Sequence, residues 1–162
     1  MKKLLIILVI AFFYACDSNE EERTYNYILA DGADFIVSDT KGVDLLDPKN
    51  ANHIKESDVK IFYLVNGVKE EVHNGLLIHP RNFLIHKFEN EEEYHITVFL
   101  NSRDKADKTT TYIQWNEKDC DTIEATFFKN KDLIFTKDIW YNKKLVFTST
   151  VPNNTPFVRL IK

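Results

Sequence analysis

Short runs in which apolar and polar residues alternate constrain the fold of this chain more than any other feature. In residues 94–100 (YHITVFL) the apolar side chains fall on every second position, and residues 109–115 and 122–129 repeat the pattern. Because successive side chains of a β-strand point to opposite faces of its sheet, this period predicts half-buried strands. Asn66-Gly67 lies between two such runs, and both residues tolerate the positive φ of a tight hairpin turn. The pattern predicts antiparallel β-structure.

The strand signal recurs along the chain, with mostly short polar connectors between the runs. The predicted strands are residues 33–38, 59–66, 68–73, 76–79, 82–87, 94–100, 109–115, 122–129, 134–141 and 144–149. Residues 43–58 are predicted to form a long loop with one helical turn. We therefore expect an all-β fold, an antiparallel two-sheet sandwich. The alternative is an up-and-down barrel of the lipocalin type, although the Gly-x-Trp that such barrels usually carry is missing here.

Length and charge narrow the function classes. A chain of 162 residues corresponds to one ordinary domain. Its 21 Lys and Arg residues are outnumbered by 25 Asp and Glu residues, so the formal net charge is −4. Nucleic-acid binding needs clustered positive charge, so nucleic acid is not a predicted partner.

The N-terminal residues are predicted to be a targeting signal and not part of the fold. Residues 1–3 (MKK) are positively charged at physiological pH, and residues 4–15 form an unbroken apolar run. A membrane-spanning helix needs roughly 20 such residues, so this run is too short to span a bilayer and has the flanks of a secretory signal. The run ends in Phe13-Tyr14-Ala15-Cys16, and the acidic stretch DSNEEER follows it.

These residues resemble the signal of a bacterial lipoprotein, in which the cysteine after a small residue is lipidated and becomes the new N-terminus. Phe13 stands where the family pattern prefers leucine, so the lipobox is a relaxed one. The acidic stretch is similar to the surface-export signal of Bacteroidota lipoproteins. The resemblance implies a signal peptide (1–15), a lipidated Cys16 in a flexible acidic tether (16–24) and one domain (25–162). It implies a lipid anchor in the outer membrane, facing the cell surface, with a periplasm-facing lipoprotein as the alternative.

Two passages within the predicted domain extend the resemblance. Residues 44–48 (DLLDP) and 57–72 (SDVKIFYLVNGVKEEV) are similar to small uncharacterised lipoproteins of the Bacteroidota. Such proteins tend to be immunoglobulin-like or related sandwiches. The resemblance implies a fold and an address, and it transfers no functional residue.

The common catalytic and cofactor motifs are missing from the sequence. The four glycines (32, 42, 67 and 75) lie too far apart for a dinucleotide-binding loop, a P-loop or a Gly-x-Ser-x-Gly nucleophile elbow. No histidine begins a His-Glu-x-x-His zinc motif, and the two cysteines do not have the spacing of a metal site. The sequence therefore predicts no cofactor, no metal and a protein that is not an enzyme.

One face of the later strands is predicted to be the core, and the other combines aromatic with polar side chains. Aromatic rings stack on the apolar faces of sugars, while carboxylates and amides hydrogen-bond to hydroxyl groups. The candidate ligand face consists of Phe99, Tyr112, Gln114, Glu124, Phe128, Asp138 and Trp140. The predicted core face consists of Tyr94, Ile96, Val98, Leu100, Ile113, Trp115, Ile123, Ala125 and Phe127. Alternatively, a loop or a second sheet covers the aromatic face.

The histidines offer a second, smaller candidate. His86 and His95 can pair across neighbouring strands, with Glu93 in the turn between them. Such a group is a minimal metal or acid–base cluster. A pair of solvent-facing strand histidines is the alternative interpretation.

The sequence as a whole predicts a membrane-anchored, surface-exposed lipoprotein that acts as a non-enzymatic binding module for a glycan or a partner protein. An alternative is a structural, assembly or adhesion subunit that docks by adding a strand to a partner's sheet, with residues 151–162 as the donor. A carboxylate-based hydrolase is the third hypothesis, although no pattern in the sequence selects the two carboxylates that it needs.

Overall fold

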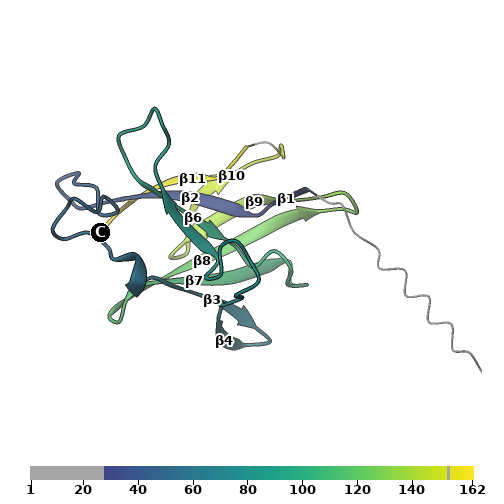
Figure 1. Cartoon of the computed structure of the whole chain (residues 1–162). Coiled ribbons are helices and arrows are strands. Elements are labelled where there is room, and N and C mark those ends of the chain that lie inside the picture. The colour runs from purple at the N-terminus through teal and green to yellow at the C-terminus, as the bar shows by residue number, and fades with distance from the viewer. Residues whose placement is uncertain (1–27, 153) are drawn as a thin grey trace, which may run out of the picture.

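The computed structural model describes residues 28–152 and 154–162, and their fold is all-β (Figure 1). The larger sheet has seven strands in these residues, with the order β1-β9-β8-β7-β3-β4 and with β10 also paired to β9. Their bounds are β1 Ile28–Ala30, β3 Lys60–Val65, β4 Val68–Glu71, β7 Lys108–Asn116, β8 Asp119–Lys129, β9 Leu133–Tyr141 and β10 Lys144–Thr148.

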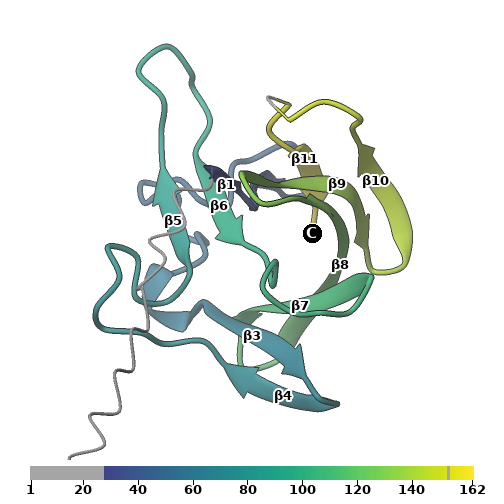
Figure 2. The ribbon, with the colours of Figure 1, turned by 90° about the vertical axis from the view of Figure 1, so that its right-hand side faces the viewer.

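The smaller sheet has four strands in the order β11-β2-β6-β5. Their bounds are β2 Gly32–Ser38, β5 Phe83–His86, β6 His95–Phe99 and β11 Phe157–Ile161. In Figure 2 the larger sheet curves from β3 and β4 through β7 and β8 to β9, and the smaller sheet faces it. The two sheets do not close into a barrel, so the predicted two-sheet sandwich is confirmed and the lipocalin-like alternative is not.

Two strands that the alternation did not reveal make both sheets mixed. β1 runs parallel to β9, with Ile28 opposite Leu133, and β11 runs parallel to β2, with Phe157 opposite Asp34. The expectation of purely antiparallel sheets was therefore wrong at the two ends of the described chain. Three residues of β1 are too few to show a period, and Pro156 interrupts the pattern immediately before β11.

Residues 76–79 were predicted to be a strand, and that prediction was wrong. They lie in a loop in which the Asn74 amide donates to the Pro80 carbonyl at 2.8 Å and the Leu77 amide donates to the Asn74 carbonyl at 3.1 Å. These bonds fold the segment back on itself, so its backbone pairs with no neighbouring strand. The long loop over residues 43–58 was correctly predicted, and its one helical turn is the 3₁₀ helix η1 (Glu56–Asp58).

The core lies between the two sheets and follows the predicted parity. The buried members of the predicted core face are Ile96, Val98, Leu100, Ile113, Trp115, Ile123 and Ala125, while Tyr94 and Phe127 are partly buried against them. β2 contributes Ala33, Phe35 and Val37 from the smaller sheet, and Val59 and Ile61 come from around the start of β3.

The predicted signal peptide, Cys16, the acidic tether and residues 25–27 lie outside the described residues. Within the residues that are described, no helix has the length and apolar character needed to cross a membrane.

Candidate functional site

The structure divides the predicted aromatic face between several places. Tyr112, Glu124 and Trp140 line one groove on the outer face of the larger sheet. Phe99 lies on β6 in the smaller sheet, so it is not part of that face. Phe128 stacks on Phe135 near the end of β8, with ring centroids 5.1 Å apart. Parity along each strand was correct, but it could not show which strands share a sheet.

The sheet-face groove has a volume of about 620 Å³. Its lining residues come from β7, β8, β9 and the turn after β9, and they are Lys108, Thr110, Tyr112, Thr122, Glu124, Trp140, Asn142 and Lys143. The strand register arranges them in rows. Glu124 stands opposite Thr110 on one side and Trp140 on the other, while Thr122 stands opposite Tyr112.

Lysines lie over both aromatic rings of the groove. Lys108 Nζ is 2.8 Å from a carboxylate oxygen of Glu124 and 4.6 Å from the Trp140 ring centroid. Lys69 Nζ is 4.7 Å from the Tyr112 centroid. Ammonium groups at these distances make cation–π contacts, so each ring of the groove faces a positive charge.

The remaining two residues of the predicted face do not line the groove. Asp138 accepts hydrogen bonds from Thr126 on β8 and Thr148 on β10. Burial raises the pKa of the Asp138 carboxyl, but the hydrogen bonds from the two threonines outweigh burial, and the pKa is lowered. Asp138 therefore serves to hold three strands together. Gln114 stands opposite Cys120, towards the other end of β7 from Lys108.

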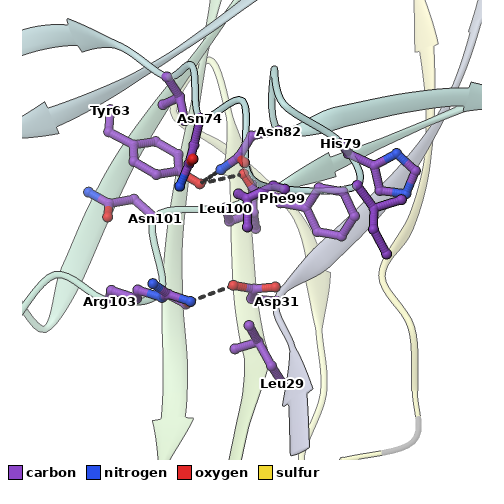
Figure 3. A pocket seen from close by; sticks show the side chains of 14 residues that line it. Leu29, Asp31, Tyr63, Asn74, His79, Asn82, Phe99, Leu100, Asn101 and Arg103 are labelled. Atoms are coloured by element: carbon purple, nitrogen blue, oxygen red, sulfur yellow. Dashed lines mark hydrogen bonds between the residues drawn. The ribbon is translucent and has the colours of Figure 1, made fainter.

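A second hollow, which we call the end pocket, lies between the sheets and has a volume of about 530 Å³ (Figure 3). No sequence pattern predicted this pocket, because its lining comes from several separate segments of the chain. Its lining is Leu29, Asp31, Tyr63, Val72, Asn74, Leu77, Ile78, His79, Asn82, Phe99, Leu100, Asn101, Ser102 and Arg103. Half of these side chains are apolar or aromatic and half are polar, but the surface that they turn into the pocket is mostly apolar, as is typical of sites for small ligands.

The polar groups of the end pocket are fixed at its two sides. Tyr63 Oη donates to the Phe99 carbonyl at 2.9 Å and accepts a hydrogen bond from Asn82 Nδ2 at 2.7 Å. Burial raises the pKa of Tyr63 to about 12, so the phenol keeps its proton. Figure 3 shows Asp31 and Arg103 on the side of the pocket away from Tyr63 and Asn82.

Asp31 is a buried carboxyl at the wall of the end pocket. It accepts a hydrogen bond from Ser102 Oγ at 2.5 Å. Burial raises the pKa of Asp31, and the hydrogen bond from Ser102 and the positive charge of Arg103 offset only part of that rise.

His86 and His95 pair across β5 and β6, with ring centroids 5.7 Å apart. His95 is buried and contacts Glu91, whereas Glu93 binds Arg159 through two bonds of 2.7 Å. The predicted pairing of the two histidines is therefore confirmed, but the carboxylate that contacts His95 is Glu91 and not Glu93, and the buried His95 means that the pair is not solvent-facing. In the part of the chain that is described, no three His, Cys, Asp or Glu side chains are grouped as metal ligands.

The fold and these hollows define a two-sheet all-β protein with one polar groove on a sheet face and one apolar pocket between the sheets. No protein-family model, curated protein or solved structure matches the chain.

Proposed function

We propose that this protein is a lipid-anchored, non-enzymatic binding protein that holds a glycan in the sheet-face groove. The observation that carries the proposal is the convergence of Tyr112 and Trp140 on one open groove with hydroxyl, amide, carboxylate and ammonium groups. This is the combination of flat apolar surface and hydrogen-bonding groups that sugar recognition needs.

The spacing of the strands suits a sugar. Tyr112 lies on β7 and Trp140 on β9, with β8 between them. Neighbouring strands are about 4.8 Å apart, so the two side chains project from lines about 10 Å apart. A pyranose ring fits between them, with Glu124 and Thr122 on the intervening strand facing its hydroxyl groups.

The charges of the groove favour an acidic glycan. Lys108 and Lys143 line the groove and Lys69 lies over its Tyr112 ring, whereas Glu124 is the one carboxylate among the lining residues. A uronate or sulfate group can pair with the ammonium of Lys108 in place of Glu124. A single carboxylate also supports binding over hydrolysis, because glycosidases use two carboxylates on opposite sides of the scissile bond.

Binding of acidic and neutral oligosaccharides to the purified full-length protein, measured by calorimetry, tests the groove. We expect Trp140→Ala and Tyr112→Ala each to weaken binding at least tenfold, because each removes a stacking surface. Phe128→Ala is the matched control, since this aromatic belongs to the same strand set but stacks on Phe135 outside the groove. Equal binding by all three variants would overturn the proposal.

The anchor is proposed from Phe13-Tyr14-Ala15-Cys16 and the acidic residues that follow. Two or more acyl chains hold a protein stably on a membrane, whereas one chain gives only reversible binding. We expect mass spectrometry of the N-terminal peptide to show acyl chains on Cys16. Protease accessibility on whole cells then tests display at the cell surface, and a protein that is protected until the outer membrane is opened would place it on the periplasmic side.

Strand addition is a second candidate, favoured by the position of β11. This strand forms one edge of the smaller sheet, and its Phe157 and Ile161 side chains are exposed. A partner's strand can pair along the outer edge of β11. Amide hydrogen exchange tests this: protection of β11 on addition of a partner is expected, and unchanged exchange in the complex would exclude it.

A further inference from the structure

Exposed apolar side chains gather at the end of the sandwich where the described chain begins. Leu76 and Ile78 are 95% and 92% exposed, and Ile28 is 68% exposed. The loop that carries Leu76 is ordered by its own hydrogen bonds, because Asn74 Oδ1 accepts from the Leu76 amide at 3.0 Å. Large apolar side chains held out in water in this way mark an interaction surface.

A basic hollow lies next to these side chains. It has a volume of about 500 Å³ and shares Ser102 and Arg103 with the end pocket. Its charged lining residues are Arg103, Lys105, Lys129, Lys131 and Asp104. Asp132 lies beside it, with a carboxylate oxygen 4.0 Å from Lys131 Nζ, and Asp107 lies two residues along the chain from the lining Lys105. Four cations against one lining carboxylate favour an anionic group in this hollow.

The apolar and basic features belong to the same end of the molecule. The Ile28 amide donates to the Asp132 carbonyl at 2.8 Å, which places the start of β1 against the β8–β9 turn that carries Lys131. Leu29 and Ile78 line the end pocket together with Arg103. In Figure 1 the C-terminus lies at the opposite side of the molecule from β1.

We propose that this end docks on a membrane by binding an anionic lipid. The basic hollow takes the phosphate headgroup, the end pocket takes part of an acyl chain, and Leu76 and Ile78 enter the apolar layer. Lys and Arg side chains near a membrane surface gain from anionic lipids, and exposed apolar side chains gain from leaving water.

The position of the anchor supports a membrane as the occupant, and this step rests on the proposed lipidation of Cys16. The 11 residues 17–27 join Cys16 to Ile28 at this end, and they span at most about 40 Å when fully extended. A lipid on Cys16 therefore keeps this end of the sandwich close to the bilayer, where weak lipid contacts suffice to orient the domain.

A fluorescent label that reports membrane depth tests the proposal in the full-length protein. Cys120→Ser removes the exposed free thiol, and Ile78→Cys then carries the label. Ile161→Cys is the matched control, since Ile161 is also exposed and stands opposite Ser38, at the end of β2 that lies away from the end pocket. The labelled proteins are reconstituted in vesicles of phosphatidylethanolamine mixed with the anionic lipid phosphatidylglycerol, and brominated acyl chains quench the label where it enters the bilayer.

We expect the label at position 78 to be quenched at least threefold more than the label at 161. The double variant Lys129→Glu/Lys131→Glu should remove most of that difference, and so should neutral vesicles. Equal quenching at 78 and 161 would overturn the proposal. Dodecyl phosphate could instead shield the position-78 label from a quencher dissolved in water, while the lipid quencher in vesicles has no effect on the label. That result would show a site for a free amphiphile and would overturn membrane docking.

The two proposals fail separately. Mass spectrometry of Cys16 reports the anchor alone. If Cys16 carries no lipid, Cys16→Ser is added so that the label stays at position 78 alone. This protein, added to preformed vesicles, still reads the contact of position 78 with lipid. Lipidated protein whose position-78 label stays in water would leave the anchor standing and remove the docking surface.

Discussion

At the scale of single residues, one carboxylate connects the C-terminal end of the described chain to three strands. Asp121 on β8 accepts hydrogen bonds from Trp115 Nε1 at 2.7 Å and from Tyr141 Oη. Asn142 Nδ2 donates to it at 2.7 Å, and Lys162 Nζ lies 2.6 Å from it. Asp121 therefore links β7, β8 and β9 to the residue that follows β11.

The Asp121 cluster predicts a dependence of stability on pH. Burial raises the pKa of Asp121, but the bonds donated by Asn142, Lys162, Tyr141 and Trp115 outweigh burial and lower it from 3.8 to about 2. A carboxyl whose folded pKa is lowered contributes stability above its unfolded pKa, and that contribution is lost as the pH falls from about 4 to about 2. The shift corresponds to about 2 kcal/mol.

We therefore expect Asp121→Asn to lower the free energy of unfolding by about 2 kcal/mol at pH 7. Urea unfolding at pH 7 and at pH 2.5 measures this free energy, and the difference in it between wild type and variant should be smaller at the lower pH. Asp119→Asn is the control, since Asp119 is more exposed and pairs only with Lys162 among these residues. A gap that stays constant with pH would contradict the assignment.

Backbone conformation at two turns gives a second prediction at this scale. Gly67 has φ of 81° in the β3–β4 hairpin, and Lys143 has φ of 70° in the β9–β10 hairpin. This region costs a residue with a side chain about 1 kcal/mol relative to glycine. Gly67→Ala should therefore destabilise the protein by about 1 kcal/mol and Lys143→Gly should stabilise it by a similar amount. Thermal unfolding measures both, with Gly75→Ala as the control.

At the scale of secondary-structure elements, the edge strand β11 joins the fold more firmly than its sequence indicates. Val158 and Leu160 are buried, while Phe157 and Ile161 on the alternate positions are exposed. Arg159 forms a salt bridge with Glu93 at 2.7 Å. Residues 151–162 were considered as a free donor segment, but β11 already pairs with β2 along all five of its residues.

A pair of neighbouring substitutions tests how β11 is held. Leu160→Ala should lower the free energy of unfolding by about 2–4 kcal/mol, because it leaves a cavity in the core. Ile161→Ala, one residue along the same strand, should change it by less than about 0.5 kcal/mol, since that side chain is in solvent. Denaturant unfolding of the two variants compares them directly. Similar effects would mean that β11 is not packed in the observed register.

The errors of the sequence analysis also occur at the scale of elements. Alternation predicted the long strands β6 to β9, because their inner faces are buried in one core and their outer faces are not. Residues 76–79 have the same apolar character, yet they form an exposed loop. Apolar character alone does not make a strand, because the backbone also needs a partner strand in register.

At the scale of the whole molecule, the two sheets share one core. Phe35 of the smaller sheet and Ile61, Ile113 and Trp115 of the larger sheet belong to the same buried cluster. Tyr63 adds a polar link between the sheets, from β3 to the carbonyl of Phe99 on β6. Neither sheet can lose its partner without exposing that cluster to water.

We therefore expect a single cooperative unfolding transition. In a Trp140→Phe variant, Trp115 is the remaining tryptophan, and its fluorescence reports the buried core. Unfolding curves from this fluorescence and from far-ultraviolet circular dichroism should coincide, as they do for two-state domains of this size. Two separated transitions would show that the sheets unfold independently.

The candidate sites also include residues that the sequence predicted correctly and residues that it did not. Tyr112, Glu124 and Trp140 were selected from strand parity, and the structure places them in one groove because β7, β8 and β9 are consecutive in both sequence and sheet. Phe99 was selected by the same rule, but β6 belongs to the other sheet. The end pocket had no signal in the sequence, because residues as distant as Asp31, Tyr63 and Arg103 line it together.

The sequence by itself determined the all-β class, the two-sheet sandwich, most strand positions and the core face, because these depend on local periodicity and on turns such as Asn66-Gly67. Tertiary structure alone decided which strands share a sheet and where the end pocket lies. It also decided the parallel pairing of β1 with β9 and of β11 with β2. Those features depend on contacts between residues far apart in the chain, and their free energy comes from burial in a shared core that no local pattern records.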